Sequence, residues 1–193
     1  ASLILRKAIT LTSREQDGEV DEYWEDFKEN VDGLGTDLDT FARRLAISSI
    51  LYGHAGTLVD YADPGDVPNL QAERDLNLRP YFVNVDAKQI LGFRRSNEIN
   101  PSQPITQIRI NELVSEAEGA FGDKVVRQIR VLEKGKFAIY RQQAVAGQRL
   151  DANGGDYTTA WVRIKDGEIS LDTIPLAITY SNKVEELISK PPL

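Results

Sequence analysis

The chain has 193 residues and no cysteine, so it can bury a substantial core but cannot form disulfides, thiolate metal sites or a cysteine nucleophile. Its single histidine, His54, excludes a multi-histidine metal site within one chain. The formal net charge of −7 is the opposite of what a DNA-wrapping surface needs. Since no apolar run reaches the roughly 20 residues that span a bilayer, we expect no membrane association.

The N-terminal part predicts a weak edge strand at 3–12 and a short acidic helix within 14–30, where Trp24 and Phe27 share one face. The clearest element is a helix over 36–52, the principal helix of the chain.

That principal helix has both end signals. Thr36 and Asp39 resemble a capping box at its start, with Thr36 as the N-cap. Gly53 occupies the usual stop position after its last turn. We expect its apolar stripe to cover one face of a sheet.

The rest of the chain is rich in strand patterns. Strands are expected, in chain order, at 56–61, 80–86, 90–95, 105–114, 125–132, 137–142, 158–165, 168–171 and 174–180. Loops are expected at 62–78, 115–123 and 143–156. Two hairpin turns are predicted, one at Glu133–Lys136 and one at Asp166-Gly167.

Strands joined by hairpins, with no helix between them, favour an antiparallel sheet. The sequence therefore predicts a single α+β domain over 1–193, mainly an antiparallel sheet with one principal helix and one shorter acidic helix.

Residues 30–39 resemble a calcium loop at first sight. Aligning Gly33 with the loop's required glycine puts Lys28 at the first ligand position and Asp39 at the last. A lysine supplies a positive charge where calcium needs an oxygen. A turn leading into a capped helix explains the pattern better.

Other candidate sites are weak. The glycine pairs Gly33/Gly35 and Gly53/Gly56 lack the strand-to-helix context of a phosphate loop. His54 could act as an acid–base residue with Asp60 or Asp63 as its partner, but no serine in a nucleophile-elbow pattern accompanies it. A turn histidine is the simpler interpretation.

Charged clusters offer two further hypotheses. Paired acids could serve a glycosidase, although a chain with 30 acidic residues contains such pairs by chance; they are Glu25/Asp26, Glu116/Glu118 and Glu185/Glu186. Arginines on neighbouring predicted strands could form a basic strip for nucleic acid, or simply the wet face of a sheet; they are Arg94, Arg95, Arg127, Arg130 and Arg141. We expect no catalytic, cofactor-binding or metal-binding residues.

Three stretches of the chain follow recognisable motifs. Residues 32–45 (DGLGTDLDTFARRL) run on to 51–61 (LYGHAGTLVDY), similar to the pattern "DGxGTxLxxFA…GxAGxLVDY". Residues 78–94 (LRPYFVNVDAKQILGFR) are similar to "LRPY…AxxIxxWR", with Phe93 in place of the usual Trp. The third stretch is similar to "IPx…KPPL" and comprises 174–176 (IPL) and 190–193 (KPPL). These motifs resemble those of a family of portal-like structural proteins of tailed bacteriophages.

The resemblance implies a non-enzymatic, wing-like fragment of a portal-type ring subunit, without the long channel helices of such proteins. The ring would sit at the capsid vertex of the virion, join head to tail and serve DNA packaging, after assembly in the host cytoplasm. Its partners would be other copies of itself and capsid and tail or adaptor proteins, with packaged DNA touched only indirectly. The absence of Met fits a fragment, which we expect to be a monomer alone.

Within such a ring, the acidic N-terminal stretch and the loops at 62–78 and 143–156 are the predicted subunit contacts. Alternative functions are a phage tail or baseplate component, a ligand-binding module, and a carboxylate-based hydrolase.

Overall fold

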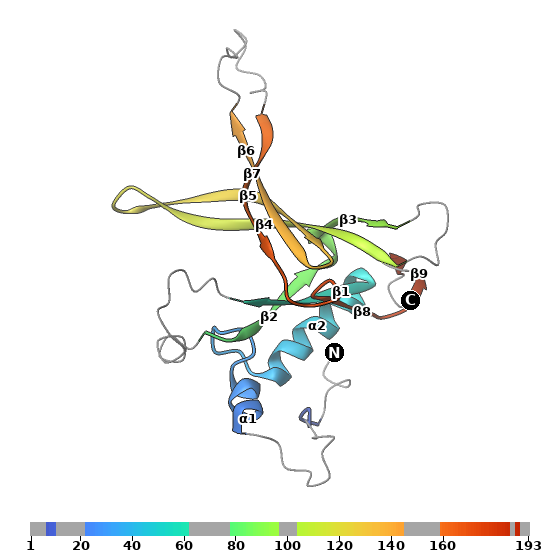
Figure 1. The fold of residues 1–193 in the computed structure, drawn as a ribbon. Coiled ribbons are helices and arrows are strands. Elements are labelled where there is room, and N and C mark those ends of the chain that lie inside the picture. The colour runs from blue at the N-terminus through green and yellow to red at the C-terminus, as the bar shows by residue number, and fades with distance from the viewer. Residues whose placement is uncertain are drawn as a thin grey trace. The chain divides into compact units, whose positions relative to one another are not determined.

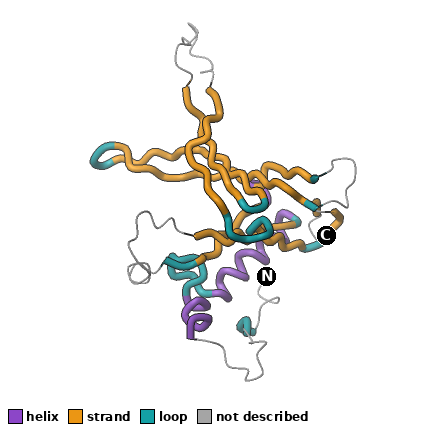
Figure 2. Tube along the Cα trace, in the orientation of Figure 1, coloured by secondary structure: helices purple, strands orange, loops and turns teal. Residues whose placement is uncertain are grey.

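The computed structural model describes residues 7–10, 22–61, 78–96, 104–144, 159–185 and 188–189. Helices and antiparallel sheets make up these residues (Figures 1 and 2), which confirms the predicted α+β, mainly antiparallel class. The chain divides into two compact units, Ala1–Ala87 with Pro175–Leu193 and, between them in sequence, Lys88–Ile174. Each unit is described by itself below.

The first unit is built on a three-stranded antiparallel sheet with the order β2-β1-β8. Its strands are β1 (His54–Tyr61), β2 (Pro80–Asp86) and β8 (Leu176–Tyr180). Helix α2 (Leu38–Tyr52) packs on these strands, as expected for the principal helix, and α1 (Glu22–Glu29) is the shorter acidic helix.

The start of α2 differs slightly from the prediction. Asp37, not Thr36, is the N-cap, and its Oδ1 accepts a hydrogen bond of 2.8 Å from the Thr40 amide. A carboxylate at this position also complements the positive end of the helix dipole, which explains why it takes the cap. At the other end Gly53 adopts the left-handed conformation at φ 86°, as the sequence predicts.

An aromatic cluster holds α1, the following turn and α2 against β2. Val31 is fully buried, and Phe27 and Phe41 are nearly so. The Phe82 ring from β2 lies edge-on to Phe27, with ring centres 5.0 Å apart, and 5.8 Å from Phe41. The Phe82 amide also donates to the Val31 carbonyl at 2.8 Å, so the turn is joined to the sheet edge.

The second unit is a five-stranded antiparallel meander with the order β3-β4-β5-β6-β7. Its strands are β3 (Ile90–Arg95), β4 (Ile105–Glu118), β5 (Gly122–Glu133), β6 (Lys136–Ala144) and β7 (Thr159–Glu168).

The buried apolar core of this second unit lies on β4, β5 and β6 and comprises Ile108, Ile110, Leu132 and Ile139. Three short elements complete the described fold, namely the 3₁₀ turn η1 (Ala87–Gln89), β9 (Lys183–Glu185) and β10 (Ile188–Ser189).

Of the two predicted hairpin turns, one is confirmed and one is wrong. The turn at Glu133–Lys136 joins β5 to β6, with Gly135 at φ 76°. Asp166-Gly167, by contrast, lies inside β7 and forms no hairpin turn. A Cβ on Gly167 would stand 2.7 Å from Cε1 of Phe137, so the glycine serves a close approach between strands.

Two other expectations are corrected. The predicted loop at 115–123 is strand up to Glu118 and again from Gly122, with only a tight turn between them. For the predicted edge strand at 3–12, the described residues 7–10 are not in a strand. The expected loops at 62–78 and 143–156 fall almost wholly outside the described residues.

The contact at Gly167 predicts a measurable cost for any side chain there. Gly167→Val should lower the free energy of unfolding by about 1–3 kcal/mol, because the new methyl groups overlap the Phe137 ring. Ala160→Val, at an exposed position of the same strand, is the matched control and should change little. Urea denaturation of both variants tests this, and equal stabilities would contradict the close-approach role.

Candidate functional site: a projecting β-ribbon and its polar junction

The outer halves of β4 and β5 extend beyond their neighbours in the sheet. Strand β3 pairs with β4 only as far as Ile110, and β6 pairs with β5 only from Gln128. Within the described chain, residues 111–118 of β4 therefore pair with β5 alone, and residues 122–127 of β5 pair with β4 alone. We call these two segments and their turn the β-ribbon; it is the long hairpin of β4 and β5 in Figure 1.

The β-ribbon exposes large apolar side chains. Opposed residues share a face, so Leu113 lies beside Arg127 and Ser115 beside Val125. Leu113 is 68% exposed, Val125 is 65% exposed, and Phe121 in the turn is fully exposed. Leu113 and Val125 lie diagonally opposite on one face, and exposed apolar side chains that lie together mark an interaction surface more often than an isolated one does.

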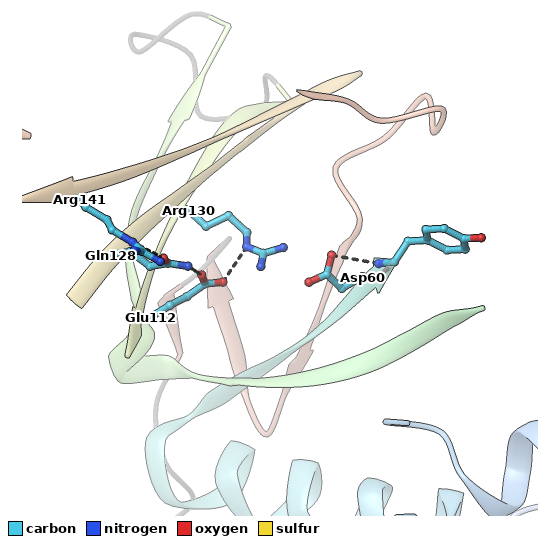
Figure 3. A network of polar contacts seen from close by, with 6 residues as sticks. Asp60, Glu112, Gln128, Arg130 and Arg141 are labelled. Carbon is cyan, nitrogen blue, oxygen red and sulfur yellow. Dashed lines mark hydrogen bonds and ion pairs between the residues drawn. The ribbon is translucent and has the colours of Figure 1, made fainter. Parts of the chain in front are cut away.

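A polar junction lies where the β-ribbon leaves the sheet (Figure 3). Gln128 of β5 is only 5% exposed; its Nε2 donates to Glu112 Oε2 at 2.6 Å. Its Oε1 accepts from Arg141 Nε of β6 at 3.0 Å. Arg130 Nε lies 2.7 Å from Glu112 Oε1, and Arg141 also forms an ion pair with Glu116.

The polar junction continues the face that carries the apolar core. Arg130 opposes both Ile110 and Ile139 in the register, so the junction residues follow directly after the isoleucines of β4 and β6. Hydrogen bonds to charged partners are stronger than neutral ones, and a buried amide left without partners is costly. The junction therefore fixes the base of the β-ribbon to β6 where the apolar core ends.

The five arginines of the predicted strip do not form one strip. Arg130 and Arg141 belong to the polar junction, whereas Arg127 lies on the opposite face and donates to Asn111 Oδ1 at 2.6 Å. Arg94, opposite Gln107, shares the face of Arg127, and the Arg95 guanidinium stacks 5.2 Å from the ring centre of Phe93. A single basic surface for nucleic acid is therefore absent from these strands.

His54 is the first residue of β1, and its ring centre lies 6.1 Å from that of Tyr180 on β8. Burial lowers the pKa of His54 below its ordinary value. Asp60 lies six residues further along the same strand, about 20 Å away, and its Oδ1 accepts from the Tyr61 amide at 3.0 Å. It cannot orient His54; the other suggested partner, Asp63, lies outside the described residues.

The turn between α1 and α2 is stabilised by the side-chain carboxylate of Asp32. Asp32 Oδ1 accepts from the amides of Leu34 at 2.9 Å and Thr36 at 3.1 Å. Partial burial tends to raise the pKa of Asp32, but hydrogen bonds from Thr36 and Leu34 outweigh it and hold that pKa below its ordinary value. Asp39 accepts from the Ile9 amide at 2.7 Å. These contacts are those of a turn before a capped helix, as predicted.

A broad open depression of about 600 Å³ lies beside this turn in the first unit, lined by Asp32, Arg44, Phe82 and Asn84 among others. Two of its polar residues have contacts within the fold already, whereas Asn84 Oδ1 is buried without a hydrogen-bond partner among the described residues. Asp32 serves the turn, and Arg79 donates to the Asn30 carbonyl while lying 5.2 Å above the Phe27 ring centre. The depression therefore offers a ligand few convergent polar groups.

Two of the three predicted acidic pairs, Glu25/Asp26 and Glu116/Glu118, lie within the described residues, and each has one member in an ion pair. Glu25 forms an ion pair with Lys28 at 2.6 Å, on the surface of α1. Glu116 is joined to Arg141, and Glu186 lies outside the described residues. Among the residues that the structure describes, no cluster of three or more acidic or histidine side chains could hold a metal ion. The helices within that part of the chain are too short or too polar to cross a membrane.

The β-ribbon and its polar junction were not predicted from the sequence.

No family model matches this chain, and no curated protein matches it either. The site therefore rests on the geometry of the chain itself.

The polar junction predicts a stability cost for losing its central amide. Gln128→Ala should lower the free energy of unfolding by about 1–3 kcal/mol, because Glu112 and Arg141 each lose a buried partner. Gln142→Ala, at an exposed glutamine on β6, is the control and should cost far less. The two variants are compared by urea denaturation, and equal costs would show that the junction contributes nothing.

The lowered pKa of His54 predicts a pH dependence for the first unit. The unfolded chain binds the proton near pH 6.5 while the folded chain resists it, so stability is full above that pH and falls below it. Because His54 is the only histidine, His54→Gln should flatten the decline between about pH 7 and 5.5. Urea midpoints across that range measure it. An unchanged slope in the variant would assign the decline to other groups.

Proposed function

We propose that this chain is a structural part of a tailed bacteriophage, the wing-like region of a portal-type ring subunit with no catalytic activity. The ring would sit at the capsid vertex, join head to tail and serve genome packaging. The motif resemblance at 32–61 and 78–94 supports the family, and the exposed apolar side chains of the β-ribbon support a role in assembly.

The β-ribbon is the observation that carries this proposal. An enzyme needs convergent reactive groups in a cleft, whereas the most distinctive described feature here is a projecting hairpin that exposes Leu113, Phe121 and Val125. Such a hairpin can contact neighbouring subunits. The net charge of −7 fits a ring through which DNA passes without adhering.

Imaging of the complete gene product tests the proposal. Electron microscopy should show closed rings of about a dozen subunits, since repeated head-to-tail contacts that close produce cyclic assemblies. The isolated 193-residue chain should elute as a monomer. Sheaths, spikes or isolated monomers of the complete product would contradict a portal-type role and favour a tail component or a ligand-binding module.

A further inference from the structure

Both long edges of the β-ribbon are open for pairing. Within the described chain, residues 111–118 of β4 have no strand beside them except β5, and residues 122–127 of β5 have none except β4. The register between them runs without a shift from Gln107↔Glu133 to Glu118↔Gly122. A regular edge of this kind is a template on which another strand can add by backbone hydrogen bonds.

The outer edges of the five-stranded sheet are less suitable. Strand β3 has register shifts against β4 at Ile90/Gly92 and Arg94/Arg95, and the β6–β7 pairing shifts at Ile139/Tyr140. Such irregularities twist an edge strand and hinder the addition of another strand. The β-ribbon is therefore the place in this unit where strand addition meets least resistance.

The two edges of the β-ribbon differ in charge. The β4 side carries Glu112, Glu116 and Glu118, the first two of which already pair with Arg130 and Arg141 of their own chain. The β5 side carries Lys124 and Arg127 with Asp123. Pairing β4 with a second β4 would bring glutamates together, whereas β4 beside β5 brings opposite charges together. The occupant that complements each edge is thus the other edge of a second copy.

We infer that copies of this chain join through their β-ribbons, with β5 of one copy antiparallel to β4 of the next. The register found within the chain would place Lys124 opposite Glu116 of the next copy, Val126 opposite Val114, and Val125 opposite Ser115. Each Lys124 would then lie between two glutamates, one from its own chain and one from the neighbour. This contact rests on the proposed ring function, for which it supplies a subunit interface.

The contact is heterologous, because each copy uses two different edges, and repetition around an axis closes a ring. It is also small. Six residues of β5 bury less than the roughly 1,000 Å² that a stable isolated interface needs, so the chain alone stays monomeric. In a ring, contacts elsewhere in the subunit raise the effective concentration of the ribbons and hold the pairing.

Single-cysteine variants test this register, because the chain has no cysteine of its own. Ser115→Cys and Val125→Cys replace exposed residues that take no part in the polar junction. Equal amounts of the two variants, one carrying a mass tag, are mixed at high protein concentration under mild oxidation. Directly opposed residues on antiparallel strands have the spacing that a disulfide requires.

The mixed dimer of the two variants should exceed either homodimer by about tenfold, equivalent to roughly 1.4 kcal/mol of preference. Its yield should fall in about 1 M salt, where the Debye length is only ~3 Å. Leu171→Cys mixed with Val125→Cys is the control for random collision. Leu171 is exposed and follows the end of β7 that pairs with Lys136, at the opposite end of β5 from the β-ribbon.

A mixed yield no higher than this control would overturn the pairing. A dominant Val125→Cys homodimer would also overturn it, in favour of a symmetric β5–β5 contact. Rings in micrographs of the complete product without the mixed crosslink would reject the ribbon pairing and keep the proposed function. The mixed crosslink without rings would support the ribbon pairing and reject the proposed ring function.

Discussion

The hydrogen bonds that Gln128 makes to Glu112 and Arg141 are the constraint on which the β-ribbon depends. The isoleucines that bind β4, β5 and β6 together end at Ile110 and Ile139, and beyond them the ribbon has no apolar core. There the nearly buried Gln128 amide holds β4, β5 and β6 together through hydrogen bonds to charged side chains on the two flanking strands. Beyond this point Arg141 still reaches Glu116 in an ion pair, and the cross-strand pairs of the β-ribbon continue to Glu118↔Gly122.

This arrangement suits a protein that works by contact. The polar junction fixes the base of the β-ribbon to the sheet. The outer part of the β-ribbon keeps two regular edges and exposed apolar side chains. The first unit is held by a separate aromatic cluster around Phe82 and Val31, and the carboxylates of its turn serve helix and turn caps. Several of the described charged groups pair with neighbours in the fold, among them Glu25 with Lys28, Glu112 with Arg130 and Glu116 with Arg141.

The sequence predicted those elements whose signals are local. The α2 helix, the glycine stop at Gly53 and the turn at Gly135 follow from periodicity and from backbone conformations that glycine favours. The hairpin turn predicted at Asp166-Gly167 was wrong because a glycine can also allow a neighbouring side chain to come close to the backbone. Only the position of Phe137 on the neighbouring strand distinguishes the two roles. Ser115 to Asp123 looked like a loop because glutamate, alanine and glycine are poor strand formers. The partners of Gln128 lie 13 and 16 residues away, so no local pattern could reveal the polar junction.

Backbone NMR of the isolated chain shows whether the β-ribbon forms in solution. We expect cross-strand nuclear Overhauser contacts at successive pairs from Asn111↔Ile129 to Glu118↔Gly122, with slow amide exchange near Gln128 and faster exchange toward the turn. If the contacts stop at Gln128 and residues 113–126 have random-coil shifts, then this segment is the loop that the sequence suggested and the β-ribbon does not exist.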